Sequence, residues 1–353
     1  MPYRVILQWV LTAFCISLVL TPVVRAFARK KHLFAQQNER TVHQGHIPRL
    51  GGIAIYSAFM ITILLTQTIT KQIMGILIGM TFLFIVGVID DLKDLSAKTK
   101  LIAQIIASLI LIYFGIQINV LRLPFGIILD FGPINFLLTI GWIVGITNAI
   151  NLIDGLDGLA GGMTSIILTI IGLTATIEGK AEIALFAFIL TGSIGGFLLY
   201  NAHPASIFMG DCGSLILGYA ISALSLLGFK SATVMTLALP ILILMIPIMD
   251  TISAILRRTL KHMKFSSADK EHIHHQLMRR FGVTKSVLIM CGMTTLFGLS
   301  AYIYMIDKEA GLLLMFLICV ILELFVEKTG MISEHFHPCI SAWRKFKKIF
   351  ITT

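Results

Sequence analysis

Apolar residues dominate this chain in repeated blocks separated by short polar or charged segments. The blocks run to about 17–23 residues, and a helix of about 20 apolar residues crosses the hydrocarbon core of a bilayer. We therefore predict about eleven membrane-spanning helices, with ends uncertain by about four residues, at residues 5–27, 50–70, 73–90, 100–115, 134–150, 158–177, 181–200, 213–229, 233–253, 285–306 and 309–327.

One stretch breaks this pattern. Residues 117–133 combine β-branched residues with Pro and Gly breaks, which is typical of a small β-hairpin. The predicted fold is an all-α polytopic membrane protein with an interfacial hairpin after its fourth span. It consists of one integral-membrane domain, residues 1–327, and a basic cytoplasmic tail, residues 328–353.

Composition agrees with a membrane location. The chain has 57% hydrophobic and 13% charged residues and a mean hydropathy of +0.91, whereas a soluble domain carries about 25% charged residues. These values exclude a secreted disulfide module, a fibrous protein and a disordered regulator. The five cysteines contain no CxxC pair and are typical of small apolar residues. The net charge of +10 indicates asymmetric loops rather than a nucleic-acid partner.

Basic residues set the expected orientation. Most of the 28 Lys and Arg residues fall in alternate connections and the C-terminal tail. By the positive-inside rule these segments face the cytoplasm, so the N-terminus lies outside and the C-terminus inside. The few basic residues expected on the other face are Arg4, Lys71, Arg122, Lys180, Lys230 and Lys308.

The first polar cluster on the expected cytoplasmic face is IDDLKDLSAKTK, which contains Asp90, Asp91 and Lys100. Two acids at a helix C-terminus oppose the helix dipole, so they favour a nearby cation. Lys100 could hold phosphate oxygens as a point charge. A solvated helix end, with lysines that only signal topology, is the simpler alternative.

The second cluster is TNAINLIDGLDGLAGG, residues 147–162. Asp154 and Asp157 share a face if this stretch is helical, and glycines beside them permit close backbone approach to a ligand. Asn148 and Asn151 place amide groups just before them. No Lys or Arg is present to explain this loop by topology, although a packing or turn role is an alternative.

The third cluster is FMGDCGSL, in which Asp211 lies at the start of the eighth predicted span. Oxygen ligands from several loops suit Mg²⁺, or Mn²⁺, better than zinc. An N-cap role for Asp211 is an alternative, and both roles could hold together.

Two basic segments complete the set of candidate residues. The long loop at 254–285 contains an HIHH run without a Cys or HExxH partner, so contact with a polyanion is favoured over a metal motif. The segment VHQGHIPRLGG precedes the second span. A solvated basic loop is the alternative. The candidate substrate-binding residues in these segments are Arg257, Arg258, His272, His274, His275, His43 and Arg49.

Together, the clusters predict an acidic centre ringed by basic loops on one membrane face. Such a centre suits metal-assisted transfer from a soluble phosphorylated donor to a lipid phosphate. A transporter is the competing class, because membrane acids also mark ion-coupled carriers. The acids here lie at span ends rather than at the midplane, which favours the enzyme.

These blocks, in this order, resemble the polyprenyl-phosphate N-acetylhexosamine-1-phosphate transferases, or glycosyltransferase family 4. The resemblance covers residues 5–327 and rests mainly on NLIDGLDGLAGG and FMGDCGSL, with IDD in support. The HIHH run is similar to the GlcNAc-1-phosphate branch, which starts lipopolysaccharide O-antigen, enterobacterial common antigen or wall teichoic acid synthesis. The longer histidine-rich loop of the MurNAc-pentapeptide enzymes is not evident.

The resemblance implies transfer of GlcNAc-1-phosphate from UDP-GlcNAc to undecaprenyl phosphate at the cytoplasmic side of a bacterial inner membrane, with release of UMP. Another UDP-N-acetylhexosamine or UDP-MurNAc-pentapeptide is the alternative donor. It also implies that Asp211 and Asn151 bind Mg²⁺ and that Asp154 and Asp157 lie on the nucleotide side. Lys100 would contact the pyrophosphate, and Asp90 and Asp91 would serve the metal or the lipid phosphate. A homodimer is compatible with the family.

Two routes fit this reaction. In the first, the lipid phosphate attacks the donor β-phosphorus in one step. In the second, Asp90 or Asp91 forms an aspartyl-phosphate first. We favour the one-step route, because a phosphomonoester with a second pKa near 6 is mostly dianionic at pH 7 and needs little help from a base.

Overall fold

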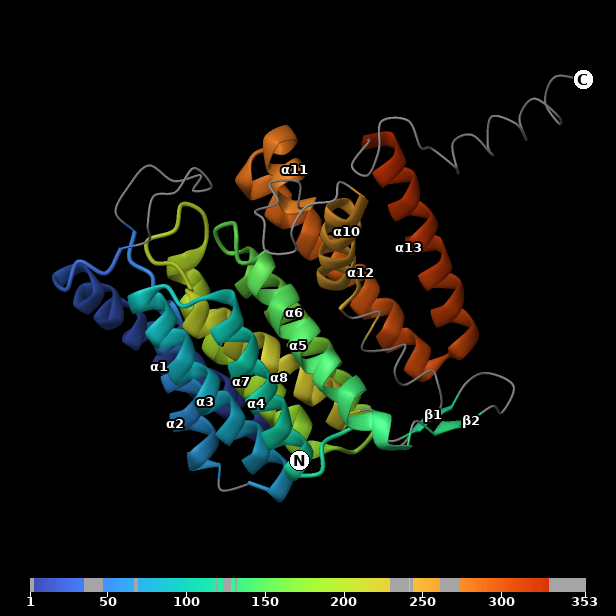
Figure 1. Cartoon of the computed structure of the whole chain (residues 1–353), viewed down its shortest axis with the longest axis horizontal. Coiled ribbons are helices and arrows are strands. Elements are labelled where there is room, and N and C mark those ends of the chain that lie inside the picture. Colours follow the sequence, from blue (N-terminus) through green and yellow to red (C-terminus); the bar gives the residue numbers. More distant parts are fainter. Residues whose placement is uncertain are drawn as a thin grey trace, which may run out of the picture.

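The computed structural model describes residues 3–34, 47–66, 69–118, 120–122, 128–130, 132–228, 241, 244–260 and 273–329. Within them the chain is almost entirely helical (Figure 1). The helices are α1 (Tyr3–Lys30), α2 (Gly51–Leu65), α3 (Lys71–Lys93), α4 (Ala97–Tyr113), α5 (Asn135–Ile153), α6 (Leu159–Ile177), α7 (Ala181–Asn201), α8 (Asp211–Gly228), α10 (Met245–Leu260), α11 (Ile273–Phe281), α12 (Val283–Ile306) and α13 (Lys308–Thr329).

The apolar blocks predicted these helices well. Each predicted span except the ninth coincides with one helix to within a few residues. Of the ninth, 233–253, the second half belongs to α10, and residues 229–240 lie outside the described ones. Among the described helices, six are long and apolar enough to cross a membrane: α1, α3, α5, α6, α7 and α12. The protein is therefore a multi-pass membrane protein, while the count of eleven spans and the orientation stay predictions.

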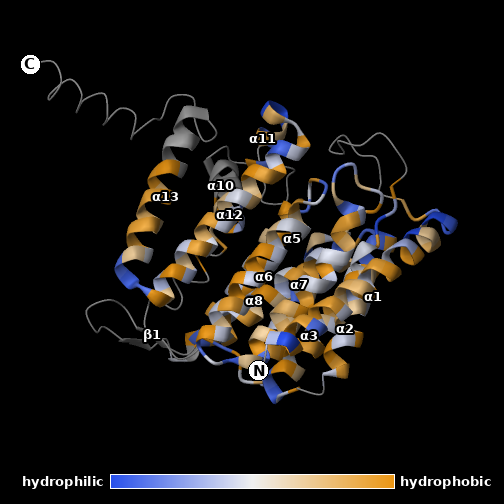
Figure 2. Ribbon diagram, turned by 180° about the vertical axis from the view of Figure 1, so that it is seen from behind, coloured by the Kyte–Doolittle hydropathy of each residue, from blue (hydrophilic) through white to orange (hydrophobic). Residues whose placement is uncertain are grey.

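The helices form one bundle in which α7 and α8 are central. α7 packs against α1 and α6, and α8 packs against α3 and α5. In the apolar, membrane-length stretch of α7, 67% of the residues are buried, whereas in the corresponding stretch of α1 only 17% are. Apolar side chains colour most of the bundle, and hydrophilic residues gather near its ends and on α11 (Figure 2). α1 thus presents most of its surface outward, as a lipid-facing helix does.

Two short strands lie in the stretch that interrupted the helical pattern. β1 (Val120–Arg122) pairs antiparallel with β2 (Ile128–Asp130), followed by the 3-10 turn Gly132–Ile134. The pair projects from the lower end of the bundle in Figure 1. The hairpin therefore occurs where the sequence predicted it.

A sharp turn joins α3 to α4 and places the first acidic cluster beside Lys100. Asp94 ends α3 in the left-handed conformation (φ 49°), and its backbone N–H donates to the Asp90 carbonyl. Ser96 then caps α4 by accepting a hydrogen bond from the Thr99 N–H. A short polar side chain at each of these positions is what a helix end and a helix start favour.

Candidate active site

The three polar clusters of the sequence meet at one end of the bundle. α3 packs on α4 and α8, and α5 packs on α8. The end of α3, the start of α4, the end of α5 and the start of α8 therefore converge at the upper end of the bundle in Figure 1. This convergence brings residues from 90 to 214 into one polar site.

Lys100 links two aspartates of this site. Its Nζ donates to Asp90 Oδ2 at 2.9 Å and to Asp211 Oδ2 at 3.1 Å. The other oxygen of Asp90 accepts from the Leu95 N–H at 2.6 Å, and Asp90 is only 2% exposed. The structure thus places a cation between two carboxylates, and its charge favours the ionised form of both.

Asp91 contacts the backbone of α8. Its Oδ1 accepts from the Asp211 N–H at 2.9 Å, and its Oδ2 accepts from the Cys212 N–H at 3.0 Å. These amides are among those that a helix N-terminus leaves without partners. Gly210, at φ +76°, passes so close that an added Cβ would lie 2.6 Å from Asp91 Oδ2. Asp91 therefore caps α8 and fixes Asp211 through its backbone.

Asn151 faces Asp211 from the end of α5. Its amide nitrogen donates to Asp211 Oδ1 and to Ser214 Oγ. Asn148, one turn earlier, exchanges two hydrogen bonds with Gln104 of α4 instead. Ser214 and Gln104 were missed by sequence reasoning, because a Ser or Gln within an apolar helix carries no separate signal.

Asp154 lies just after α5 and is half-buried. Burial, followed by the negative charges of Asp211, Asp91 and Asp157, raises the pKa of its carboxyl to about 8. Ionisation is disfavoured because several acids share a poorly hydrated region. A positive charge brought into this region would relieve that repulsion.

Asp157 is tied to the loop that precedes α8. Its Oδ2 lies 2.8 Å from His203 Nδ1 and accepts from the Ala205 N–H at 3.0 Å. Nearby, Asn201 Oδ1 accepts from the Gly158 N–H. The Asp157 side chain has no exposed surface, while that of His203 is 37% exposed. His203 was not predicted as a site residue, although a His in the Lys- and Arg-free NAHPAS segment was an available signal.

Arg49 reaches this site from the segment before α2. It donates to the Asp91 carbonyl at 3.1 Å and pairs with Asp94 Oδ1 at 2.7 Å. The segment is held by Phe208, whose N–H donates to the Pro48 carbonyl and whose carbonyl accepts from the Gly51 N–H. In this structure Arg49 therefore binds the C-terminal end of α3.

The histidine-rich region is described only in part. His43 and His272 lie outside the described residues, and Arg257 and Arg258 lie on α10 with side chains outside them. His274 is 1% exposed, and its ring centroid is 4.3 Å from that of His275. His274 is thus buried rather than presented at an open surface.

The acids of the site can accommodate a cation supplied with a ligand. Among the described residues, no three His, Cys, Asp or Glu side chains form a group that could hold a metal. Mg²⁺ typically uses one or two protein carboxylates together with substrate phosphates rather than a closed protein cage. The donor set at Asp211 and Asn151 therefore fits Mg²⁺ in that mode.

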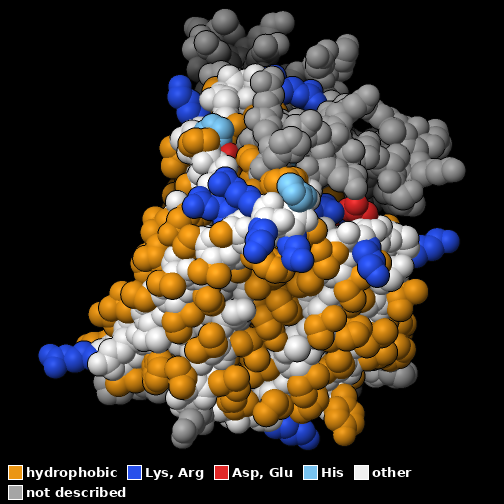
Figure 3. Space-filling model, turned by 90° about the vertical axis from the view of Figure 1, so that its left-hand side faces the viewer, with side chains coloured by type: hydrophobic (Ala, Val, Ile, Leu, Met, Phe, Trp, Pro, Cys, Tyr) orange, Lys and Arg blue, Asp and Glu red, His pale blue; other side chains and the backbone are white. Residues whose placement is uncertain are grey.

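The surface around this end has a distinct charge pattern. Figure 3 shows Lys and Arg side chains gathered in a band above a broad apolar face. α1 ends in this region with Arg29 and Lys30, and Arg25 lies over the Tyr200 ring at 5.7 Å. Basic side chains bordering an apolar belt are typical of a membrane–water interface.

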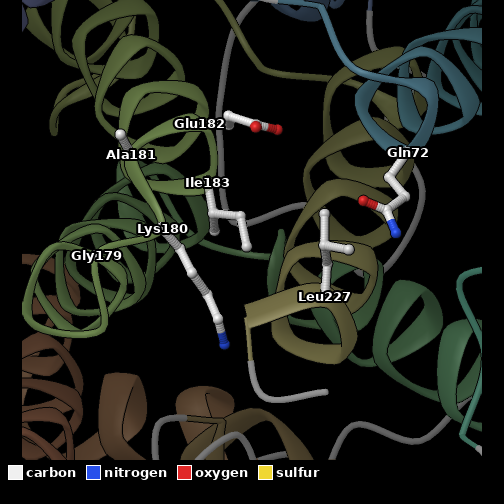
Figure 4. Close-up of a pocket in the computed structure, with 7 residues that line it drawn as sticks. All are labelled: Gln72, Gly179, Lys180, Ala181, Glu182, Ile183 and Leu227. Atoms are coloured by element: carbon white, nitrogen blue, oxygen red, sulfur yellow. The ribbon is translucent and has the colours of Figure 1, made fainter. Parts of the chain in front are cut away.

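A cavity of about 530 Å³ lies elsewhere and does not belong to this site (Figure 4). Its lining includes Gln72 at the start of α3, Lys180 and Leu227. Gln72 and Asp90 are separated by most of α3, which at 1.5 Å per residue is roughly 27 Å. The cavity thus opens at the opposite end of the bundle from the acidic cluster.

Comparison with known proteins is consistent with this geometry. Residues 73–229, which contain the three polar clusters, match the model of the family described as glycosyl transferase family 4. The chain is 39% identical to a probable undecaprenyl-phosphate N-acetylglucosaminyl 1-phosphate transferase of Bacillus subtilis, over 96% of this chain and 97% of that protein.

More distant relatives carry similar names. A decaprenyl-phosphate N-acetylglucosaminephosphotransferase of Mycobacterium leprae is 33% identical over 76% of each chain. An undecaprenyl-phosphate alpha-N-acetylglucosaminyl 1-phosphate transferase of Escherichia coli is 28% identical over 75% of this chain and 74% of that protein.

Proposed function

The chain belongs to glycosyl transferase family 4, and from this premise we propose that it transfers GlcNAc-1-phosphate from UDP-GlcNAc to undecaprenyl phosphate. The products are undecaprenyl-diphosphate-GlcNAc and UMP. The observation that carries the proposal is the Asp90–Lys100–Asp211 contact inside the matched region. The names of the relatives indicate the acceptor and the sugar phosphate.

The proposed metal is Mg²⁺, with Mn²⁺ as a substitute. Asp211 and Asn151 would hold it, and Asn151 would have to turn its amide so that the oxygen replaces the nitrogen now facing Asp211. When bound, Mg²⁺ neutralises part of the charge on the donor pyrophosphate. The excess of aspartates over the single lysine bonded to them favours this cation.

In the proposed reaction an oxygen of the lipid phosphate attacks the β-phosphorus of UDP-GlcNAc. The bond from that phosphorus to the bridging oxygen breaks, and UMP leaves with the bond electrons. Lys100 binds the pyrophosphate as a point charge. Asp154 and Asp157 lie on the nucleotide side of the site. Asp157 acts there by orienting His203.

A one-step transfer is supported by the contacts of the two alternative nucleophiles. Both oxygens of Asp91 accept backbone hydrogen bonds, and both oxygens of Asp90 accept from Leu95 and Lys100. Each carboxylate is almost fully buried. Attack by either on phosphorus would require loss of these bonds in a region with little water to replace them.

The proposed location is a bacterial cytoplasmic membrane with the site facing the cytoplasm, where UDP-sugars are present. The product would begin a cell-envelope polysaccharide or teichoic acid. The expected partners are UDP-GlcNAc, undecaprenyl phosphate and the bilayer, and a homodimer remains part of the proposal. The basic band beside the site supports this side.

The test is UMP release by purified protein in detergent with undecaprenyl phosphate and Mg²⁺. UDP-GlcNAc, UDP-GalNAc and UDP-MurNAc-pentapeptide are compared, with Asp211→Asn as the inactive control and Asp307→Asn, at the α12–α13 turn, as the matched active one. We expect turnover with UDP-GlcNAc that Asp211→Asn abolishes. Turnover only with the pentapeptide donor would refute the proposed donor.

A further inference from the structure

We propose that Asp250 and His274 form a positioning pair that holds the loop at residues 154–158 (the 154–158 loop) against the active site. This inference rests on the proposed function for its kinetic consequences, but its structural consequence can be measured without turnover. Asp250, at the end of the ninth predicted span, was expected from the family resemblance to lie at the mouth of the sugar-nucleotide site. His274 was expected to contact the sugar nucleotide, and its surroundings indicate a different task.

Asp250 contacts the start of α11 through both of its carboxylate oxygens. Its Oδ1 accepts from the Ile273 N–H at 2.7 Å, and its Oδ2 lies 3.3 Å from His274 Nδ1. The two side chains are each 1% exposed. A buried carboxylate is costly unless it is paired and hydrogen-bonded, so this arrangement fixes α11 to α10.

The opposite edge of the His274 ring lies against the 154–158 loop. A methyl group added at Gly155 would sit 2.7 Å from His274 Nε2. Gly155 follows Asp154 directly, and Asp157 lies two residues later. The ring therefore fills the space between α10 and the backbone that carries these two acids.

The Asp250 carboxylate lies on the Nδ1 side of the buried His274 ring and restricts how the ring is turned. With Nδ1 directed to Asp250, Nε2 is directed to the Gly155 backbone. The buried ring cannot lie in an open substrate path. The pair therefore acts on the reaction through the 154–158 loop, and α11 depends on the same carboxylate for its position.

Three substitutions separate this role from a general effect on folding. Asp250→Ala removes the contacts of the carboxylate with Ile273 and His274. His274→Asn keeps a donor near the Nδ1 position but removes the Nε2 edge. Gly155→Ala adds the methyl group that the ring excludes. Glu309→Gln, on an exposed residue at the start of α13, is the matched control.

The first readout is amide hydrogen exchange, which needs no substrate. We expect faster exchange in the 154–158 loop for Asp250→Ala and His274→Asn, and faster exchange at the start of α11 for Asp250→Ala alone. In these two variants, exchange in α7 should match that of the wild type. The control Glu309→Gln should match the wild type in the 154–158 loop and in α11 as well. Unchanged exchange in the 154–158 loop of both variants would overturn the proposal, whether or not the protein transfers GlcNAc-1-phosphate.

The second readout is kinetic coupling. A misplacement of about 1 Å caused by a mutation remote from the chemistry can cost about 100-fold, so Gly155→Ala should lower kcat/KM for the donor by at least about tenfold. In the His274→Asn background, which has room for the methyl group, the same change should cost less than about threefold, since no ring remains to be displaced. Equal losses in both backgrounds would contradict a contact between ring and loop. An inactive wild type would instead refute the proposed function and leave the exchange result to decide.

Discussion

The capping of α8 by Asp91 gives a prediction whose size can be worked from the structure. The carboxylate accepts two backbone N–H groups, at 2.9 and 3.0 Å, and Asp91 is 5% exposed. A hydrogen bond to a charged group contributes about 1.5–3 kcal/mol, and loss of an N-cap costs about 0.5–2 kcal/mol. Relief from burying the carboxylate offsets part of this. Asp91→Ala should therefore lower the free energy of unfolding by about 2–4 kcal/mol.

Asp91→Asn should cost about half as much, because the amide keeps one acceptor oxygen but presents its NH₂ group to the second N–H. Both variants should also lose transfer activity, since Asp211 is held through the N–H that Asp91 binds. The activity of both variants should fall further than their lowered stability alone would explain. Asp91→Asn, which loses only part of the stability, should show this difference.

One assay measures the unfolding midpoint in detergent, with tryptophan fluorescence as the probe. The other measures UMP release at a temperature at which each variant is folded. Asp94→Asn is the matched control, because Asp94 ends the same helix and pairs with Arg49 while its side chain is 49% exposed, and Asn also tolerates the left-handed backbone of this position. An exposed pair contributes at most about 1 kcal/mol. If Asp91→Ala were no less stable than Asp94→Asn, the capping role would be refuted.

Four further predictions use other contacts. The pKa of Asp154 is raised to about 8, so the folded state keeps a proton that the unfolded state loses near pH 4, and the free energy of unfolding should fall as pH rises from about 4 to 8. In metal-free thermal unfolding, Asp154→Asn should show a smaller fall over this pH range, and an equal slope in both proteins would contradict the prediction. Lys100→Gln leaves Asp90 and Asp211 facing each other and should abolish UMP release, with partial recovery in Lys100→Arg; full activity of Lys100→Gln would refute its role. Gly52→Ala puts a Cβ 2.2 Å from the Gly213 nitrogen and should lower the unfolding free energy by about 1–3 kcal/mol or more, whereas Gly141→Ala, with open space, should raise it by about 0.5–1 kcal/mol. His203→Ala removes one partner of Asp157 and should raise the donor KM more than it lowers kcat, which titration of initial rates with UDP-GlcNAc would show.

Much of the fold could be predicted because a membrane span is encoded locally. Twenty apolar residues cross a bilayer as helix whatever their neighbours are, so helices such as α6 and α12 were placed to within a few residues. α2 ends at Leu65, earlier than predicted, where the polar and β-branched sequence TQT begins. Membership of the site was also predictable in part, because uncharged and acidic clusters on one face stood out against the positive-inside pattern.

The hydrogen-bond partners of the individual side chains in the site could not be predicted in this way. Asp91 caps a helix that begins 120 residues later, and no local pattern connects the two positions. Asp157 and His203 are likewise joined only by packing of the loop before α8. Arg49, which was predicted to bind substrate, also binds Asp94 and the end of α3 in this structure, and no local pattern indicated these contacts. Such pairings depend on how the helices pack, which residue patterns alone do not specify.

The central claim is that the chain moves a sugar together with its phosphate onto a lipid phosphate. The most direct test supplies UDP-GlcNAc radiolabelled at the β-phosphorus to the purified protein with undecaprenyl phosphate and Mg²⁺. We expect the label to enter the lipid fraction in equal amount to unlabelled UMP, and to do so in Asp307→Asn but not in Asp211→Asn. Release of labelled UDP, or label remaining in soluble GlcNAc-1-phosphate, would contradict the account.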